Sequence, residues 1–80
     1  MERFEHCLLE FYWSRPAHAG APAFPPSFTI FHPDGREESA QGGNPEVTAA
    51  LSRLGKAGWR GAGNVATMNW ILWTLERKLP

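Results

Sequence analysis

The sequence has only one cysteine, Cys7, so no disulfide can form within the chain. Small extracellular domains usually depend on disulfides, and an 80-residue chain without one suits a reducing compartment. We expect the Cys7 thiol to be a small buried hydrophobic group, the usual state of a free cysteine, and not a nucleophile. The N-terminus carries acidic residues with no apolar segment after it, unlike a secretory signal peptide. These features predict a cytoplasmic protein.

Long hydrophobic runs and an excess of charge of either sign are also missing. No stretch approaches the ~20 apolar residues of a membrane-spanning helix. The formal net charge is zero, and the eight Lys and Arg residues are scattered along the chain. Nucleic acids and anionic membranes are usually bound through clustered basic residues, so we predict neither as a partner.

Aromatic side chains, in contrast, are plentiful and make up 12% of the residues. A domain this small buries only about 60% of the surface that its unfolded chain exposes, so nearly every large apolar side chain is needed in the core. Large rings can build a core from few positions. We predict one α+β domain over residues 1–80, in which a small antiparallel sheet of three to five strands has one α-helix packed on one face.

Two segments near the ends of the sequence are predicted to be the main strands. Residues 3–13 are rich in aliphatic and aromatic side chains and contain no Gly or Pro. The more apolar of their two alternating faces is expected to cover the core, and it consists of Glu5, Cys7, Leu9, Phe11 and Trp13. Residues 69–77 carry large apolar side chains on both faces, with Ile71, Trp73 and Leu75 on one and Trp70 and Leu72 on the other.

A Pro-rich loop and a hairpin are predicted to follow the first strand. Residues 14–27 hold four prolines, which resist both a helix and a central strand. Residues 28–32 are β-branched and aromatic, and the Pro-Asp-Gly sequence at 33–35 is typical of a turn. Residues 36–39 are expected to return as the partner strand, and residues 40–43 to continue as coil.

A helix with defined ends is predicted from Asn44 onward. Asn44 is suited to cap free N–H groups, Pro45 to the first helical position and Glu46 to the positive end of the helix dipole. Gly58 is expected just beyond the end of the helix, where a residue with positive φ is common. One apolar stripe is predicted to face the sheet, formed by Val47, Ala50, Leu51 and Leu54.

Residues 59–66 have the pattern of a weaker strand, interrupted by Gly61 and Gly63. Strand glycines often mark a β-bulge or close packing. The alternative is that the missing side chains leave a hollow near the Pro-rich loop that holds a small organic molecule. The residues expected to line such a ligand-binding hollow are Trp59, Arg60, Gly61, Gly63, Asn64 and Trp70.

Reactive side chains show no known catalytic or metal-binding spacing. The histidines, His6, His18 and His32, lack the regular spacing of a metal site, and we expect no metal and no cofactor. His6, Glu10 and Tyr12 share one face of the first strand and are the candidates for an acid or base. His6 and Glu10 are about 13 Å apart at ~3.3 Å per residue, too far to act as a pair alone.

The helix end and the strands around it resemble a family of short bacterial proteins of unknown function. Residues 51–59 read Leu-Ser-Arg-Leu-Gly-Lys-Ala-Gly-Trp, similar to the family's helix ending in Leu-Gly-x-x-Gly-Trp before a C-terminal β-hairpin. The hairpin would end in Leu-Glu-Arg-Lys-Leu at residues 75–79. Residues 4–11 are similar in pattern to the family's first strand, of the type Trp-Glu-Tyr-Lys-Val-Val-Glu-Leu. The resemblance implies a fold and no reaction.

The two apolar faces of residues 69–77 bear most directly on function. A single helix can cover only one face of a sheet, and a large exposed apolar area usually marks an interface, so we expect a homodimer. The leading interpretation is a small self-associating binding or accessory protein that holds a small organic metabolite in a bacterial biosynthetic pathway. Two alternatives stay open: a small cofactor-independent cyclase or isomerase acting on a metabolite, and a structural protein–protein interaction module.

Overall fold

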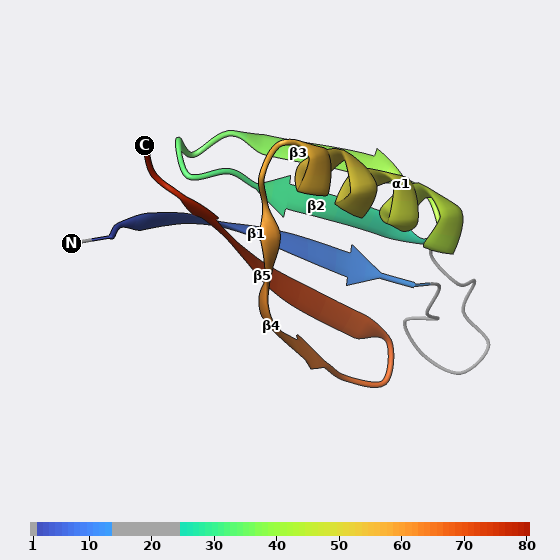
Figure 1. Ribbon diagram of the computed structural model, residues 1–80. Coiled ribbons are helices and arrows are strands. Elements are labelled where there is room, and N and C mark those ends of the chain that lie inside the picture. The colour runs from blue at the N-terminus through green and yellow to red at the C-terminus, as the bar shows by residue number, and fades with distance from the viewer. Residues whose placement is uncertain (1, 14–24) are drawn as a thin grey trace.

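The computed structural model describes residues 2–13 and 25–80, which form a five-stranded antiparallel sheet and one α-helix (Figure 1). The strands lie in the order β3-β2-β1-β5-β4. The α+β architecture, with one helix on one face of an antiparallel sheet, is therefore confirmed. Residues 14–24 of the predicted Pro-rich loop lie outside the described residues, as does His18. The elements are β1 (Phe4–Tyr12), β2 (Ser27–Phe31), β3 (Glu37–Gln41), α1 (Asn44–Lys56), β4 (Arg60–Ala66) and β5 (Trp70–Lys78).

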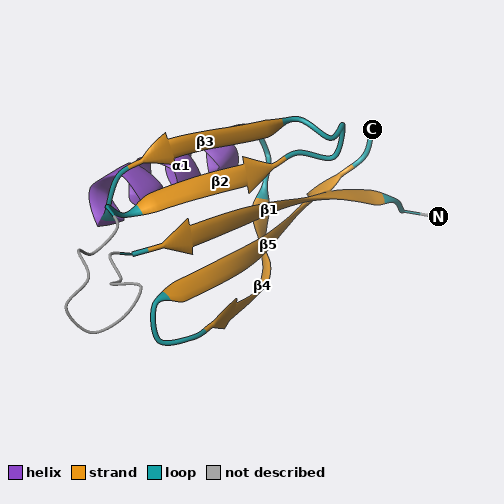
Figure 2. Ribbon diagram, turned by 180° about the vertical axis from the view of Figure 1, so that it is seen from behind, coloured by secondary structure: helices purple, strands orange, loops and turns teal. Residues whose placement is uncertain are grey.

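The first and last strands of the chain occupy the middle of the sheet. β1 pairs with β2 on one side and with β5 on the other, which leaves β3 and β4 as the two edges. α1 follows one edge strand and precedes the other, so the chain must cross the sheet between them. Figures 1 and 2 both show α1 lying along β2 and β3, and Figure 2 shows the opposite face without a helix. The helix therefore covers only part of one face.

The core lies between α1 and the face of the sheet that was predicted from the alternation of the first strand. Cys7, Leu9 and Phe11 are buried there, and Leu9 and Ile30 have no exposed surface. The period of two in an extended chain places these side chains on one face. The other buried members are Phe28, Val47, Ala50, Leu54, Trp59 and Leu75.

The N-terminus of α1 differs by one residue from the prediction. Gly43 is the N-cap residue, and Asn44, expected as the cap, is the first residue of the helix. The Glu46 carboxylate accepts a hydrogen bond from the Gly43 backbone N–H at 2.7 Å, and the Val47 N–H donates to the Gly43 carbonyl at 3.0 Å. A carboxylate that reaches back in this way satisfies a free N–H, so the cap needs no side chain of its own.

The C-terminus of α1 ends in the turn that was predicted around Gly58. Gly58 has a φ of 97°, its N–H donates to the Gly55 carbonyl at 3.0 Å, and the Trp59 N–H donates to the Leu54 carbonyl at 3.1 Å. These two bonds form a Schellman motif, which satisfies free carbonyls at a helix end. Leu54 and Trp59 are both buried in the core, as this motif favours.

The predicted hairpins are present, with small shifts in their bounds. Residues 33–35 turn the chain between β2 and β3, and Gly35 has a φ of 89°. β3 runs to Gln41, two residues into the segment expected to be coil, because residues 40 and 41 still pair with β2. β4 and β5 form the second hairpin, and their pairing shifts between Gly61 and Gly63. The β-bulge interpretation of these glycines agrees with that shift.

Candidate functional site

The three acid or base candidates lie on the face of the sheet that α1 does not cover. His6, Glu10 and Tyr12 alternate along β1 with the buried core residues. Glu10 Oε2 accepts a hydrogen bond from Trp70 Nε1 at 3.1 Å. His6 lies further along β1, and its Nε2 is 3.9 Å from Oε2 of Glu76 on the neighbouring strand β5. The structure thus gives Glu10 and His6 separate partners and forms no shared site from the three.

The six residues predicted to line a ligand hollow lie on two faces of the sheet. Gly61 pairs with Leu75 and Gly63 with Thr74, so Ala62 is an extra residue on β4. Two residues apart on a regular strand share a face, but the bulge turns Gly61 and Gly63 to opposite faces. Trp59, Gly61 and Asn64 lie on the helix side, and Arg60, Gly63 and Trp70 lie on the other. Their ligand-binding role stays a prediction, and the geometry does not gather them around one cavity.

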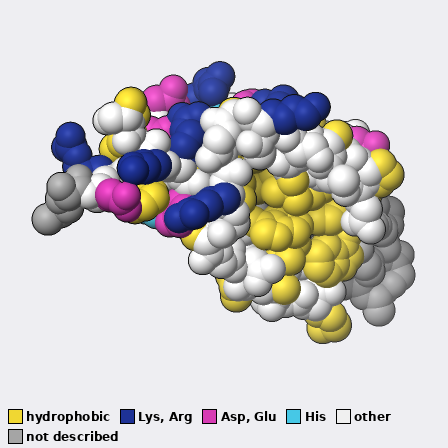
Figure 3. Space-filling view, viewed as in Figure 1, with side chains coloured by type: hydrophobic (Ala, Val, Ile, Leu, Met, Phe, Trp, Pro, Cys, Tyr) yellow, Lys and Arg dark blue, Asp and Glu magenta, His cyan; other side chains and the backbone are white. Residues whose placement is uncertain are grey.

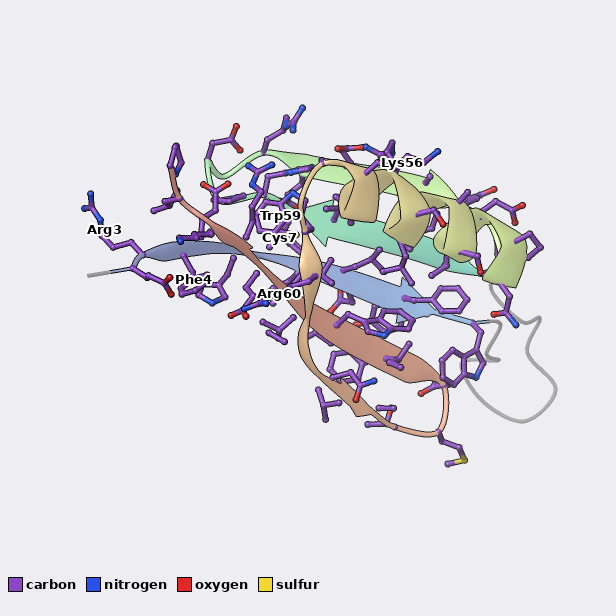
Figure 4. All side chains as sticks on the ribbon, viewed as in Figure 1. Arg3, Phe4, Cys7, Lys56, Trp59 and Arg60 are labelled. Carbon is purple, nitrogen blue, oxygen red and sulfur yellow. The ribbon has the colours of Figure 1, made fainter. Side chains whose placement is uncertain are left out.

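The Trp59 ring is part of the hydrophobic core and not an exposed ring that faces a ligand. The ring is buried near Cys7 at the end of α1 (Figure 4). The Arg77 guanidinium lies over it, with Cζ 4.3 Å from the ring centroid. Arg60, the next residue, points to the other side and pairs with Glu76 at 3.0 Å.

A charged hollow of about 420 Å³ opens beside this end of the helix. It lies where the β2–β3 turn, the C-terminal end of α1 and residues of β1 and β5 meet. We call it the helix-end hollow. Its lining is formed by Glu5, His32, Pro33, Asp34, Arg36, Glu38, Arg53, Ala57, Trp59 and Arg77.

The helix-end hollow contains a chain of three hydrogen-bonded groups. His32 Nε2 lies 2.6 Å from Glu38 Oε1, and Arg53 Nη2 donates to Glu38 Oε2 at 3.0 Å. The His32 side chain is only 9% exposed. The hydrogen bonds from His32 and then from Arg53 lower the pKa of the Glu38 carboxyl below its ordinary value. Glu38 therefore holds His32 and Arg53 in place from opposite sides.

Sequence patterns indicate one part of this hollow, the proximity of His32 and Glu38, but not the hollow as a whole. His32 and Glu38 lie on the two arms of the predicted hairpin, close to its turn. Glu38 pairs with Ile30 and lies diagonally across from His32 on the same face, and long side chains in such diagonal positions interact, so an acid near a histidine was a recognisable pair. Arg53 reaches them only because α1 lies over β3, which is a long-range feature that the helix pattern alone does not give.

A second surface of interest is the part of the sheet beside the helix. Trp13, Leu51, Ile71 and Trp73 are packed against the core but only partly buried. Figure 3 shows a continuous group of hydrophobic side chains below α1, over β1 and β5, while Lys and Arg gather toward the other end. The rings of Phe11 and Trp13 contact each other at a tilt of 58°, with centroids 5.6 Å apart. We call Trp13, Leu51, Ile71 and Trp73 the apolar half-face.

Cys7 is buried, as the sequence predicted, at 1% exposure. Burial raises the pKa of the Cys7 thiol, the charge of Arg77 opposes this and that of Glu5 adds to it. A buried thiol with a raised pKa is a poor nucleophile.

Residues 2–13 and 25–80 carry neither a helix suited to cross a membrane nor a cluster of side chains suited to hold a metal. The helix in this part of the chain is not long and apolar enough to cross a membrane. The same residues contain no group of three His, Cys, Asp or Glu side chains placed to hold a metal ion.

No family model, curated protein or solved structure matches the chain. The family resemblance of the helix end therefore stays a prediction, and function must be argued from the geometry.

Proposed function

We propose that the protein is a small self-associating binding protein, in which two copies pair along β4. The observation that carries this proposal is an uncharged edge strand beside an apolar surface. All seven residues of β4 are exposed, and none from Gly61 to Ala66 is charged. An uncharged edge presents free backbone groups that another strand can pair with.

β3, at the other edge of the sheet, carries features that oppose pairing with a second copy. β3 carries Glu37 and Glu38, and α1 lies beside it. Charged side chains and a neighbouring helix are the usual means of preventing edge-to-edge pairing. Between Gly61 and Ala66, β4 has neither, and beyond its bulge at Gly61–Gly63 the residues Asn64 to Ala66 form a regular, uncharged edge. We therefore favour association through β4.

A second copy is the occupant that fits β4. A strand edge is self-complementary when two copies run antiparallel about a twofold axis, which is the simplest closed symmetry. That axis is perpendicular to the sheet, so both helices lie on the same side of a continuous sheet. The two apolar half-faces then lie on that same side of the sheet, between the helices and separated by the two β4 strands. The formal net charge of zero means that two copies do not repel each other through net charge.

A small accessory or binding protein accounts for these features better than the alternatives. The cyclase or isomerase alternative is not favoured by any observation on β1, because Glu10 and His6 have separate partners. Self-association alone describes an interaction module, and the helix-end hollow adds a place for a ligand. One buried thiol and no disulfide among the described residues suit the reducing cytoplasm, where we place the protein.

Sedimentation equilibrium tests the association. We expect a species of twice the chain mass of 8.9 kDa at micromolar concentration. Val65→Lys places a charge on β4 at a side chain that is 52% exposed, and should shift the equilibrium at least about tenfold toward monomer. Gln41→Lys, on the β3 edge, is the matched control and should leave it unchanged. A monomeric parent, or equal effects of the two variants, would refute pairing by β4.

A further inference from the structure

We propose that the helix-end hollow binds a small organic anion through a carboxylate or phosphate group, held by Arg36 and Arg53. This deepens the proposed function by naming the site and the class of ligand. The site lies within one chain, so its test does not depend on self-association. Several separate segments converge on it, from β1, the β2–β3 turn, β3, α1 and β5.

Arg77 forms a fixed wall of the hollow and is not free to hold a ligand. Its Nε and Nη2 both donate to Glu5 Oε1, and its Nη1 donates to the Ala57 carbonyl at 3.0 Å. One face of the guanidinium also covers the Trp59 ring. With all three nitrogens engaged, Arg77 shapes the site and neutralises Glu5.

Arg53 and Arg36 keep donors that these contacts do not use. In the part of the chain that the structure describes, Arg53 donates through Nη2 to Glu38, and its Nε and Nη1 are not engaged. The Arg36 guanidinium likewise has no side-chain partner among residues 2–13 and 25–80, although it lines the hollow. Guanidinium groups with free N–H pairs recognise carboxylates and phosphates through paired, charge-assisted hydrogen bonds.

Each acidic residue of the hollow is engaged through at least one carboxylate oxygen, which favours an anion over a cation as the ligand. Glu38 is held by His32 and Arg53, and Glu5 by Arg77. Asp34 accepts a hydrogen bond from the Arg36 backbone N–H at 2.9 Å, which fixes the turn that carries Arg36. Arg36 and Arg53 keep positively charged donors that line the hollow and are not engaged by these acids, and an anion is their complement.

His32 and Glu38 act as positioning residues for this site. His32 is nearly buried at the base of the turn, and its ring nitrogen bonds one oxygen of Glu38 while Arg53 bonds the other. The pair therefore holds the Arg53 guanidinium through its Nη2, and the Nε and Nη1 groups have no partner among the described residues. A guanidinium that is fixed before binding loses less conformational entropy when the ligand arrives.

The size of the hollow limits the ligand to a small molecule. Its volume of about 420 Å³ lies toward the lower end of the range of roughly 300–1,000 Å³ for small-molecule sites. A purely structural role explains the ion pairs less well, because an exposed ion pair contributes only about 0–1 kcal/mol to stability. A structural role also gives no use for the unengaged donors of Arg36.

A titration followed by NMR of backbone and arginine Nε–H groups tests the site. The probes are inorganic phosphate and benzoate, with sodium chloride at matched ionic strength as the reference. We expect saturable shifts at Arg36, Arg53 and Gly35 with at least one probe. Saturation by phosphate alone, by benzoate alone or by both supports the proposal and identifies the anion group. Shifts that follow chloride for both probes would overturn it.

Variants separate this site from general charge effects. Arg36→Gln should weaken binding of the active probe at least about tenfold, as expected for the loss of one charge-assisted contact. This change removes no described side-chain contact, so the fold is retained. Arg60→Gln removes a guanidinium paired with Glu76 outside the hollow and should leave binding unchanged. Equal effects of the two substitutions would overturn the assignment. Sedimentation of Arg36→Gln should match the parent, which separates this outcome from the test of pairing by β4.

Discussion

The Arg77 guanidinium covers the buried ring of Trp59, with Cζ 4.3 Å from the ring centroid, and donates to the Ala57 carbonyl at the end of α1. One side chain from the last strand thus joins the helix end, the core and Glu5 on the first strand. Gly58 lies between Ala57 and Trp59, the two residues that Arg77 contacts, and a Cβ added at Gly58 would lie 3.2 Å from Arg77 Cδ. The helix end, β1 and β5 are therefore stabilised together.

Two glycines of the helix end should respond in opposite directions to alanine. Gly58→Ala should destabilise the protein by about 1–2 kcal/mol, because a Cβ is disfavoured at the φ of 97°. Gly55→Ala should stabilise it by about 0.5–1 kcal/mol, because Gly55 is helical and a Cβ there meets open space. Urea unfolding followed by tryptophan fluorescence measures both. The same sign for both substitutions would contradict the Schellman assignment.

The Cys7 thiol should be protected in the folded protein. Its burial and raised pKa predict that a thiol reagent at pH 8 reacts at least about 100-fold more slowly than in urea, since reaction requires opening of the core. Met68, which is 93% exposed, gives the control: Met68→Cys in a Cys7→Ala background should react at the rate of a free thiol. Fast labelling of Cys7 in the native protein would show that the core around β1 is not closed.

The Glu38 carboxyl should add a pH-dependent contribution to stability. Its pKa is lower in the folded chain than the ordinary value of 4.5. Such a group stabilises the fold above its unfolded pKa, and the contribution is lost as the pH falls through its folded pKa. Because Glu38 is partly exposed, we expect less than about 1 kcal/mol.

Glu38→Gln measures this contribution. The difference in unfolding free energy between parent and variant should shrink between about pH 5.5 and pH 3, as the carboxyl of the parent becomes protonated. Glu37→Gln, at an exposed neighbour on the other face of β3, is the control for removing a carboxylate from β3. A parent–variant difference that is constant over this range would contradict the ion pairs at the helix end.

Local patterns predicted the elements, and long-range packing decided how they meet. The alternation of Cys7, Leu9 and Phe11 and the positive φ of Gly58 depend on neighbouring residues only, and both were predictable. The two faces of Gly61 and Gly63 were not, because a bulge is defined by the partner strand and not by the glycines themselves.

In the helix-end hollow too, contacts within one hairpin were predictable from the sequence, and contacts between separate elements were not. His32 and Glu38 belong to one predicted hairpin, so their pairing was accessible from the sequence. The third member, Arg53, comes from α1 and depends on where the helix lies across the sheet. The apolar half-face depends on the same placement, because the helix stripe shows that one face is covered but not which strands are left open.

The placement of β5 between β1 and β4 has a consequence for how the sheet is assembled. Each residue of β1 from Phe4 to Tyr12 pairs with a residue from the far end of the sequence, and the backbone N–H of Leu79 donates to the Arg3 carbonyl at 2.8 Å. Until residues 70–78 are in place, β1 has an open inner edge and β4 has nothing to pair with. Contacts between distant segments form slowly because a long loop must close first. Until then, β1 presents an unpaired backbone edge, and β4 becomes the outer edge of the sheet only once β5 lies between it and β1.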